Sequence, residues 1–195
     1  MSSPKKNLTL YKTKRNFEST PEPTGKQSHN KNTKNIFVVQ QHDARSMHYD
    51  FRLQINGVLV SWAVPKGPSI DPKIKRLAIR TEDHPLDYAG FEGFIPEGNY
   101  GAGAVIVWDT GTYTNLKTDV TMQESLNRGE ITIQLHGKKL KGGFALIKTH
   151  LYAQGSWLLV KMRYEQAQDK STITTQAPES VLSNTTIKDL EKQKK

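Results

Sequence analysis

The sequence predicts a mainly β fold: a compact antiparallel β-barrel, or a sandwich, of about eight strands with one or two short helices. Three observations lead to this fold class. Eight β-like runs follow one another at short spacing, the turns between them carry glycine or proline, and the alternating helices of βαβ units are missing from the pattern. The runs cover residues 36–41, 47–55, 58–64, 76–80, 104–109, 130–135, 143–148 and 156–162.

The first three runs are the most informative. The run IFVVQQ (36–41) is followed by MHYDFRLQI (47–55) and VLVSWAV (58–64), and all three are rich in β-branched and aromatic residues. The dipeptide Asn56-Gly57 separates the second run from the third. Because both residues tolerate positive φ angles, this dipeptide predicts a two-residue hairpin turn. The later runs have the same composition and end at similar turn residues.

One helix is predicted between the fifth and sixth runs. Thr121 and Glu124 have the spacing of a capping box, in which each side chain bonds the backbone N–H of the other residue. Gly129 follows Arg128 and supplies the left-handed residue that commonly ends a helix. The sequence therefore predicts a helix of about two turns that ends at Arg128.

Charge and composition divide the chain into three parts. Residues 1–35 carry eight lysine and arginine residues against two glutamates, a net +6 of the total +9, and show no apolar period. We expect this segment to be a basic arm, partly ordered over the active site, that contacts a polyanion such as nucleic acid phosphate or serves as a solubilising tail. Residues 36–164 are predicted to form the barrel, and the polar residues 165–195 a disordered tail.

The composition limits the class of protein. The chain has 195 residues, a pI of about 9.6 and 35% hydrophobic residues, which suits one domain of ordinary size. The absence of cysteine rules out disulfides and thiolate metal sites. No apolar run approaches the roughly 20 residues of a membrane helix, and no signal-peptide pattern opens the sequence. We expect a cytoplasmic protein that has no contact with a membrane.

The stretch QHDARSMHYDFRL gathers two histidines, two aspartates and two arginines. Side chains two apart on a strand share a face, so His48, Asp50 and Arg52 lie on one face and the apolar residues between them on the other. Gln40 and His42 share a face of the preceding strand. The link DARSM is short enough to bring the two strands side by side, so we expect His42 close to His48 and Asp50.

This cluster has the chemistry of a metal site. Two imidazoles and one carboxylate, from His42, His48 and Asp50, are a competent ligand set for Mn²⁺, Fe²⁺ or Zn²⁺ and leave positions for water and substrate. Arg52 offers a planar fork that suits two phosphate oxygens. From the residues alone, structural histidines and an ordinary ion pair at Arg52 remain alternatives.

A second cluster, RTEDHPLDY, follows the fourth run. Pro85 discourages a helix through His84, so the strand ends by presenting Glu82, Asp83 and His84 on a turn. Taken locally, an acidic loop with an incidental histidine explains this pattern as well. A functional role for this second cluster gains support if the turn lies over the first cluster.

The glycine-rich stretch IPEGNYGAG, residues 95–103, lacks the Lys-Ser/Thr of a phosphate-binding P-loop. We predict a tight turn whose backbone approaches the site.

Three long segments together resemble the 3′-phosphoesterase domain of bacterial DNA ligase D. They are FVVQQHDARSMHYDFRLQINGVLVSWAVPKGPSIDP, KRLAIRTEDHPLDYAGFEGFIPEGNYGAGAVIVWDTGTY, and LHGKKLKGGFALIK with SWLLVK. The likeness runs from about Tyr11 to Arg163. The likeness implies a compact β-barrel. It also implies the stand-alone form of the domain, since 195 residues leave no room for a polymerase or ligase module.

The resemblance also implies an activity. Members trim a terminal ribonucleoside from a DNA 3′ end by cutting a phosphodiester, and then remove the remaining 3′-phosphate to leave a 3′-hydroxyl. The activity depends on a metal, preferentially Mn²⁺, with Co²⁺ or Zn²⁺ as other candidates. The expected substrates are DNA 3′ ends, namely primer-templates with a terminal ribonucleotide or a 3′-phosphate, met during non-homologous end joining. A separately encoded DNA ligase and an end-binding protein are the expected partners, and a monomer the expected state.

Roles for individual residues follow from the same resemblance. His42, His48 and Asp50 would hold the metal, Arg52 and His84 would engage the phosphate, and Tyr88 would complete the site near the metal's water. In the N-terminal arm, KRNF carries over Arg15 but has Asn16 where the family has aspartate, which weakens a charge-based role there. Further substrate-binding positions are Glu22, Gln40, Lys66 and Arg76.

Two other functions fit part of the pattern. Two histidines and a carboxylate also form the facial triad of non-haem Fe(II) oxygenases, although the second histidine of that motif usually comes from a distant strand. A nucleic-acid-binding module without catalysis would retain the arm and the barrel. The basic arm and Arg52 favour a phosphate substrate over the oxygenase.

Overall fold

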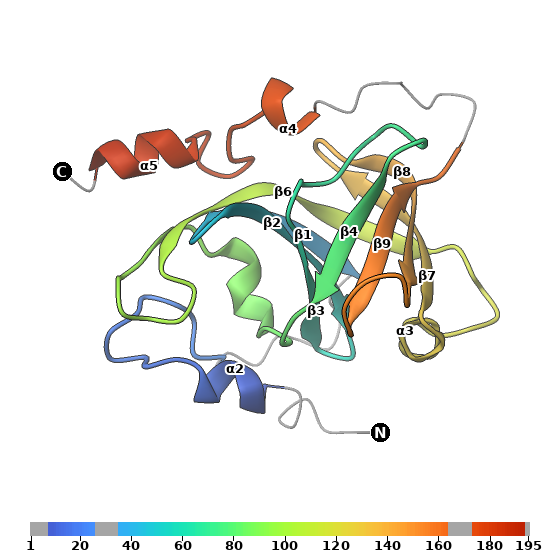
Figure 1. Cartoon of the computed structure of the whole chain (residues 1–195), viewed down its shortest axis with the longest axis horizontal. Helices are drawn as coiled ribbons and strands as arrows, with labels where there is room; N and C mark the ends of the chain where they lie inside the picture. The colour runs from blue at the N-terminus through green and yellow to red at the C-terminus, as the bar shows by residue number, and fades with distance from the viewer. Residues whose placement is uncertain (1–7, 26–34, 164–172, 194–195) are drawn as a thin grey trace.

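The computed structural model describes residues 8–25, 35–163 and 173–193 and confirms the predicted fold class. Eight antiparallel strands form a closed barrel in the order β1-β2-β3-β4-β9-β8-β7-β6, and β6 pairs back with β1 (Figure 1). Closure of the ring settles the choice between barrel and sandwich. The strands are β1 (Ile36–Asp43), β2 (Met47–Ile55), β3 (Val58–Val64), β4 (Lys75–Arg80), β6 (Gly103–Asn115), β7 (Glu130–Gly137), β8 (Lys141–Lys148) and β9 (Ser156–Lys161).

Local sequence signals explain most of these elements. Asn56 and Gly57 have φ angles of 50° and 80° and join Ile55 directly to its partner Val58, as the hairpin turn requires. Helix α3 (Met122–Arg128) has the predicted capping box, with Thr121 and Glu124 bonding each other's backbone N–H. Gly129 ends this helix in the left-handed conformation. The eight predicted strands are all present, and β6 is longer than its predicted run.

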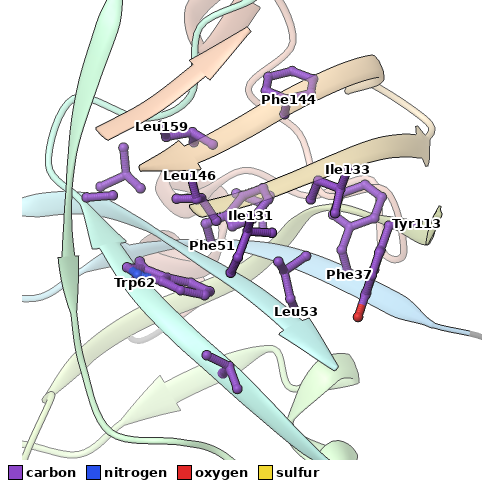
Figure 2. Packing of buried hydrophobic residues seen from close by; sticks show 14 of the residues in the cluster. Phe37, Phe51, Leu53, Trp62, Tyr113, Ile131, Ile133, Phe144, Leu146 and Leu159 are labelled. Carbon is purple, nitrogen blue, oxygen red and sulfur yellow. The ribbon is translucent and has the colours of Figure 1, made fainter. Parts of the chain in front are cut away.

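The inside of the barrel is filled by apolar side chains. All eight strands contribute to this buried cluster, and Phe51, Trp62, Ile131 and Phe144 are among its largest members (Figure 2). The alternation predicted for β2 is confirmed, because Phe51 and its apolar neighbours two residues away point into the cluster. The intervening polar side chains therefore point to the outside of the barrel wall.

A second apolar cluster attaches covering segments to that outer face. Val38 and Leu59 of the barrel pack with Tyr11 of helix α2 (Thr9–Thr13) and with Tyr88 of the 3-10 helix η1 (Leu86–Gly90). The short strand β5 (Gly93–Ile95) pairs with the start of β6 beside them. These three short elements were not predicted, because each depends on contacts with the barrel and has little local signal. Tyr88 of η1 and Ile95 of β5 line a cleft outside the barrel.

The described part of residues 165–195 departs from the predicted disordered tail. Residues 173–193 contain the short helices α4 (Ile173–Gln176) and α5 (Ile187–Gln193), and Ile187 is buried against Ala104 and Ile106. The indole N–H of Trp108 donates to the carbonyl of Ala177 at 2.7 Å. The polar composition concealed these few anchors, since single apolar residues carry no periodic signal.

None of the helices in the described ranges has the length and apolar character needed to span a membrane.

Asp109 holds the turn between β7 and β8, which gives a stability prediction. Its buried carboxylate accepts the backbone N–H groups of Lys138, Lys139 and Leu140 at 2.8–3.1 Å. Replacing Asp109 with alanine leaves these donors unsatisfied, so we expect the free energy of unfolding in urea to fall by about 3 kcal/mol. The matched change at exposed Asp119 should alter it by less than about 0.5 kcal/mol. Equal stability of the two variants would contradict this role for Asp109.

Candidate metal centre

The pairing of β1 with β2 brings the three predicted metal ligands together. His42 and His48 are directly opposed in the register of the two strands, and Asp50 lies two residues beyond His48 on the same face. The candidate ligand atoms of His42, His48 and Asp50 all lie within 4.8 Å of one another. Such a cluster of two imidazoles and a carboxylate matches the donor set that Mn²⁺, Fe²⁺ and Zn²⁺ accept.

Hydrogen bonds to carbonyl groups orient both imidazoles. The Nε2 atom of His42 lies 2.8 Å from the carbonyl oxygen of Gly101, and the Nδ1 atom of His48 lies 2.9 Å from that of Ser46. A carbonyl oxygen only accepts, so these nitrogens carry the protons. The remaining ring nitrogens face the carboxylate of Asp50 at 3.7 and 3.8 Å.

This arrangement fits a metal ion. In their neutral forms the two rings direct lone pairs toward an anionic carboxylate, which is repulsive unless a cation lies between them. The outer N–H of each ring bonds a backbone carbonyl, as is usual for histidines that ligate metals. His42, His48 and Asp50 can therefore hold a divalent metal, and the same donors are shared by several metals of the first transition row.

Asp50 remains a carboxylate in this environment. Burial alone would raise the pKa of Asp50, but the positive charge of Arg52, together with His42 and His48, outweighs burial and lowers it well below its usual range. The Nη2 group of Arg52 donates to the Asp50 carboxylate at 3.0 Å. The anionic ligand of the candidate metal centre is thus available at neutral pH.

Arg52 is buried and held in one orientation. Its Nε–H donates to Gln40 at 2.8 Å, and its Nη1 group donates to the hydroxyl of Ser61 at 2.8 Å. Gln40 in turn donates to the carbonyls of Tyr88 and Phe91, which fixes its own side chain. The planar guanidinium of Arg52 therefore lies beside the metal-ligand cluster with little rotational freedom.

His84 lies between two guanidinium groups. Its Nδ1 atom is 2.9 Å from Nη1 of Arg52, and its Nε2 atom is 3.2 Å from Nη2 of Arg15. Burial, followed by the charges of Arg52 and Arg15, lowers the pKa of His84 well below its usual value, so the ring is neutral. The Nδ1 atom also lies 3.0 Å from the carbonyl oxygen of Glu82, which only accepts, so Nδ1 carries the proton and faces Arg52 as an N–H, whereas Nε2 accepts from Arg15. An anionic oxygen at this point would accept from both arginines.

The N-terminal arm completes the wall of the cleft. Arg15 donates from Nε to Glu22 at 2.8 Å, and from Nη1 to Glu82 at 3.3 Å. The hydroxyl of Tyr88 donates to the same Glu22 oxygen at 3.0 Å. Asn16 bonds only within the arm in the described structure, where its side chain accepts the N–H of Glu18. Arg15 and Glu22, which the resemblance indicated, thus lie against the second cluster of the sequence.

Two of the residues indicated by the resemblance lie elsewhere. Lys66 is exposed in the turn after β3, and Arg76 lies on β4 on the same face as Ala78, which is buried inside the barrel. The described residues that line the cleft include neither Lys66 nor Arg76. Strand alternation explains the position of Arg76, since the cleft lies on the opposite face of the sheet.

Two polar residues of the site had been given no role from the sequence. Ser61 is opposite Arg52 in the β2–β3 register, and strand alternation combined with that register would have found it. Glu82 was assigned to an acidic loop, but it is buried and bonds Lys14 and Arg15 from the arm. Its only local signal was its position two residues before His84.

The cleft has a volume of about 810 Å³, within the range of ordinary small-molecule sites. Its walls come from β1, β2, the turn that holds His84, the arm and the loop of residues 96–102. The candidate ligands and both arginines face this one space.

Comparisons with known proteins agree with the geometry. The family model for the DNA Ligase D 3′-phosphoesterase domain matches residues 40–148. The chain is 48% identical over 186 residues to the multifunctional non-homologous end joining protein LigD of Pseudomonas aeruginosa, covering 93% of this chain and 22% of that protein. It is 44% identical to LigD of Mycobacterium tuberculosis and 43% identical to LigD of Mycolicibacterium smegmatis, covering 88% and 80% of this chain. The chain thus spans about a fifth of the length of these curated relatives, 22% and 20% for the latter two. The chain belongs to the DNA ligase D 3′-phosphoesterase domain family.

Proposed function

We propose that this protein is a metal-dependent hydrolase that processes DNA 3′ ends. It cuts the phosphodiester that joins a terminal ribonucleoside, and then removes the remaining 3′-phosphate to leave a 3′-hydroxyl. Mn²⁺ is the preferred metal. The observation that supports this function is the position of His42, His48 and Asp50 beside the guanidinium of Arg52 in one cleft.

The residues around the metal ligands suit a phosphate group. The chemistry that a divalent metal supplies when bound by His42, His48 and Asp50 is charge neutralisation and the activation of water. Arg52 binds the non-bridging phosphate oxygens, and Asp50, Gln40 and Ser61 keep its fork oriented.

Four further residues, His84, Arg15, Tyr88 and Glu22, contribute around that phosphate. A phosphate oxygen near His84 supplies the acceptor that the neutral ring cannot provide to both Arg15 and Arg52. Tyr88 is a positioning residue, since its hydroxyl bonds Glu22, which in turn holds Arg15.

The names of the relatives support a cellular role in non-homologous end joining. We propose that the protein acts as a monomer in the cytoplasm, close to the nucleoid. A DNA ligase and an end-binding protein, encoded separately, would be its partners.

A metal-by-substrate panel tests the function. Protein stripped with EDTA is supplied with Mn²⁺, Mg²⁺, Co²⁺, Zn²⁺ or Fe²⁺ and given a primer-template that ends in one ribonucleotide or in a 3′-phosphate. We expect a 3′-hydroxyl product from both substrates with Mn²⁺ and no product with EDTA. Without the metal, His42, His48 and Asp50 cannot supply the positive charge that neutralises the phosphate and activates water. Gel electrophoresis and the release of inorganic phosphate measure the two steps.

Two outcomes of the panel would contradict the proposal. Oxygen uptake with Fe²⁺ and a 2-oxoacid, without phosphate chemistry, would identify an oxygenase. Salt-sensitive DNA binding that is indifferent to EDTA, with no product from either substrate, would identify a binding module without catalysis.

A further inference from the structure

Tyr100 is an exposed aromatic residue in the wall of the cleft. It lies in the loop of residues 96–102 that precedes β6, and 49% of its surface is exposed. The buried tyrosines 11, 49, 88 and 113 have their rings in apolar clusters, whereas the ring of Tyr100 faces the space beside the metal ligands. A ring that stays exposed in a cleft beside charged side chains is a feature that burial of apolar surface does not explain.

The backbone on both sides of Tyr100 is anchored. Asn99 donates to the carbonyl of Ser19 in the N-terminal arm at 3.3 Å and accepts the Ser19 hydroxyl at 2.7 Å. The carbonyl of Gly101 accepts the Nε2–H of His42 at 2.8 Å. Figure 1 shows this loop (yellow-green) beside the arm (blue). Tyr100 is therefore held one residue away from the group that orients a candidate metal ligand.

Two cations, Lys14 and Arg15, lie near the ring, and the guanidinium carbon of Arg15 is 5.6 Å from the ring centre. The ammonium of Lys14 lies 4.5 Å from the centre of the Tyr100 ring and donates to its hydroxyl at 3.2 Å. Glu82 accepts from the same ammonium at 3.0 Å and keeps it in place. An aromatic face next to a fixed cation is the combination that binds single nucleotides, because the base stacks on the ring and the cation attracts phosphate oxygens.

We propose that Tyr100 and Lys14 form a subsite for the terminal nucleoside of the 3′ end, with its base stacked on the Tyr100 ring. This inference rests on the proposed function. The arm and the loop are joined at this side of the cleft by the contacts of Ser19 with Asn99 and of Lys14 with Tyr100. These contacts close the cleft on this side, so a DNA strand cannot continue past Tyr100. The nucleoside next to Tyr100 is therefore the last one of the DNA strand.

Kinetics with the two substrates test the subsite. A 3′-phosphate end has no nucleoside beyond the phosphate, whereas a terminal ribonucleoside does. With Tyr100→Leu we expect the ratio of kcat/KM for the ribonucleoside end to kcat/KM for the 3′-phosphate end to fall about tenfold, mainly through KM. Tyr100→Phe keeps the ring and should keep this ratio within about twofold of the unsubstituted protein. Tyr152→Leu, at a similarly exposed tyrosine outside the cleft lining, is the matched control and should not change the ratio.

A binding measurement gives a readout without catalysis. Primers carry the fluorescent base 2-aminopurine either at the terminal ribonucleoside or one position before it, and are bound to the EDTA-treated protein. We expect quenching of the terminal base only, and loss of that quenching in Tyr100→Leu with retention in Tyr100→Phe. Because EDTA abolishes hydrolysis, this result stands even where the panel of metals fails to give a product.

Three outcomes would overturn the subsite. Quenching of the penultimate base alone would assign the Tyr100 ring to the retained strand. An equal loss of kcat/KM on both substrates would mean that the substitution disturbs His42. Quenching and a kinetic ratio that do not respond to Tyr100→Leu would remove this residue from substrate binding altogether.

Discussion

Asp50→Asn is expected to lower the rate of 3′-end hydrolysis at least about a thousandfold while the barrel stays folded. Asparagine has the same shape as aspartate but no charge, so the two imidazoles lose their anionic partner and the metal loses its only charged ligand among the three. The same change leaves the Arg52 Nη2 group at most a neutral amide oxygen, a weaker acceptor than the carboxylate. One substitution that removes a charge therefore weakens both the metal-ligand cluster and the anchoring of Arg52.

Single-turnover product formation with saturating Mn²⁺ measures this effect, and calorimetric titration of Mn²⁺ measures the loss of metal affinity. Asp119→Asn, an exposed change away from the cleft, is the matched control and should behave like the unsubstituted protein. Circular dichroism establishes that the barrel remains folded. Activity of Asp50→Asn within tenfold of the control would exclude this cluster as the reaction centre.

Arg52→Lys is expected to reduce kcat/KM on both substrates by about two to three orders of magnitude, although the positive charge is kept. The guanidinium contacts Asp50, Gln40 and Ser61 at the same time because it is planar and carries its donors in a fork. A lysine ammonium is a point charge that cannot reach these acceptors and a phosphate together. The unmet acceptors are buried, so we also expect a loss of about 2 kcal/mol in the free energy of unfolding.

Parallel urea unfolding and steady-state kinetics separate the two effects of Arg52→Lys, since a variant that is folded at the assay temperature but inactive has lost function through geometry. Arg128→Lys at the exposed end of α3 is the control and should change neither quantity. An Arg52→Lys protein with nearly full activity would show that charge alone is sufficient at this position, and that the fork has no role in binding phosphate.

The part of the site that could be predicted is the part on β1 and β2. Strand alternation placed His48 and Asp50 on one face, and the short link to the preceding strand placed His42 opposite them. These are local rules, and the structure obeys them because the apolar residues between the polar ones fill the barrel. The hairpin at Asn56 and the cap at Thr121 were predictable for the same reason.

The rest of the cleft depends on contacts between distant parts of the chain. Glu82 reaches Arg15 across 67 positions, and His42 is oriented by Gly101 across 59. No local propensity encodes such pairs, because each requires the completed barrel and the covering segments. Arg76 shows the converse limit: the family resemblance suggested a role for it in the site, but strand alternation turns it to the other face of the wall.

The candidate metal centre lies on the outer surface of the barrel wall and is covered by the arm, η1 and the loop of residues 96–102, while the interior of the barrel is filled by its own apolar side chains. The stability of the barrel and the specificity of the cleft can therefore change independently, in evolution and in engineering. Substitutions that repack the interior should move the melting temperature and leave the choice of DNA terminus alone. Exchange of one of the covering segments between relatives should change which DNA terminus is preferred, while the barrel stays the same.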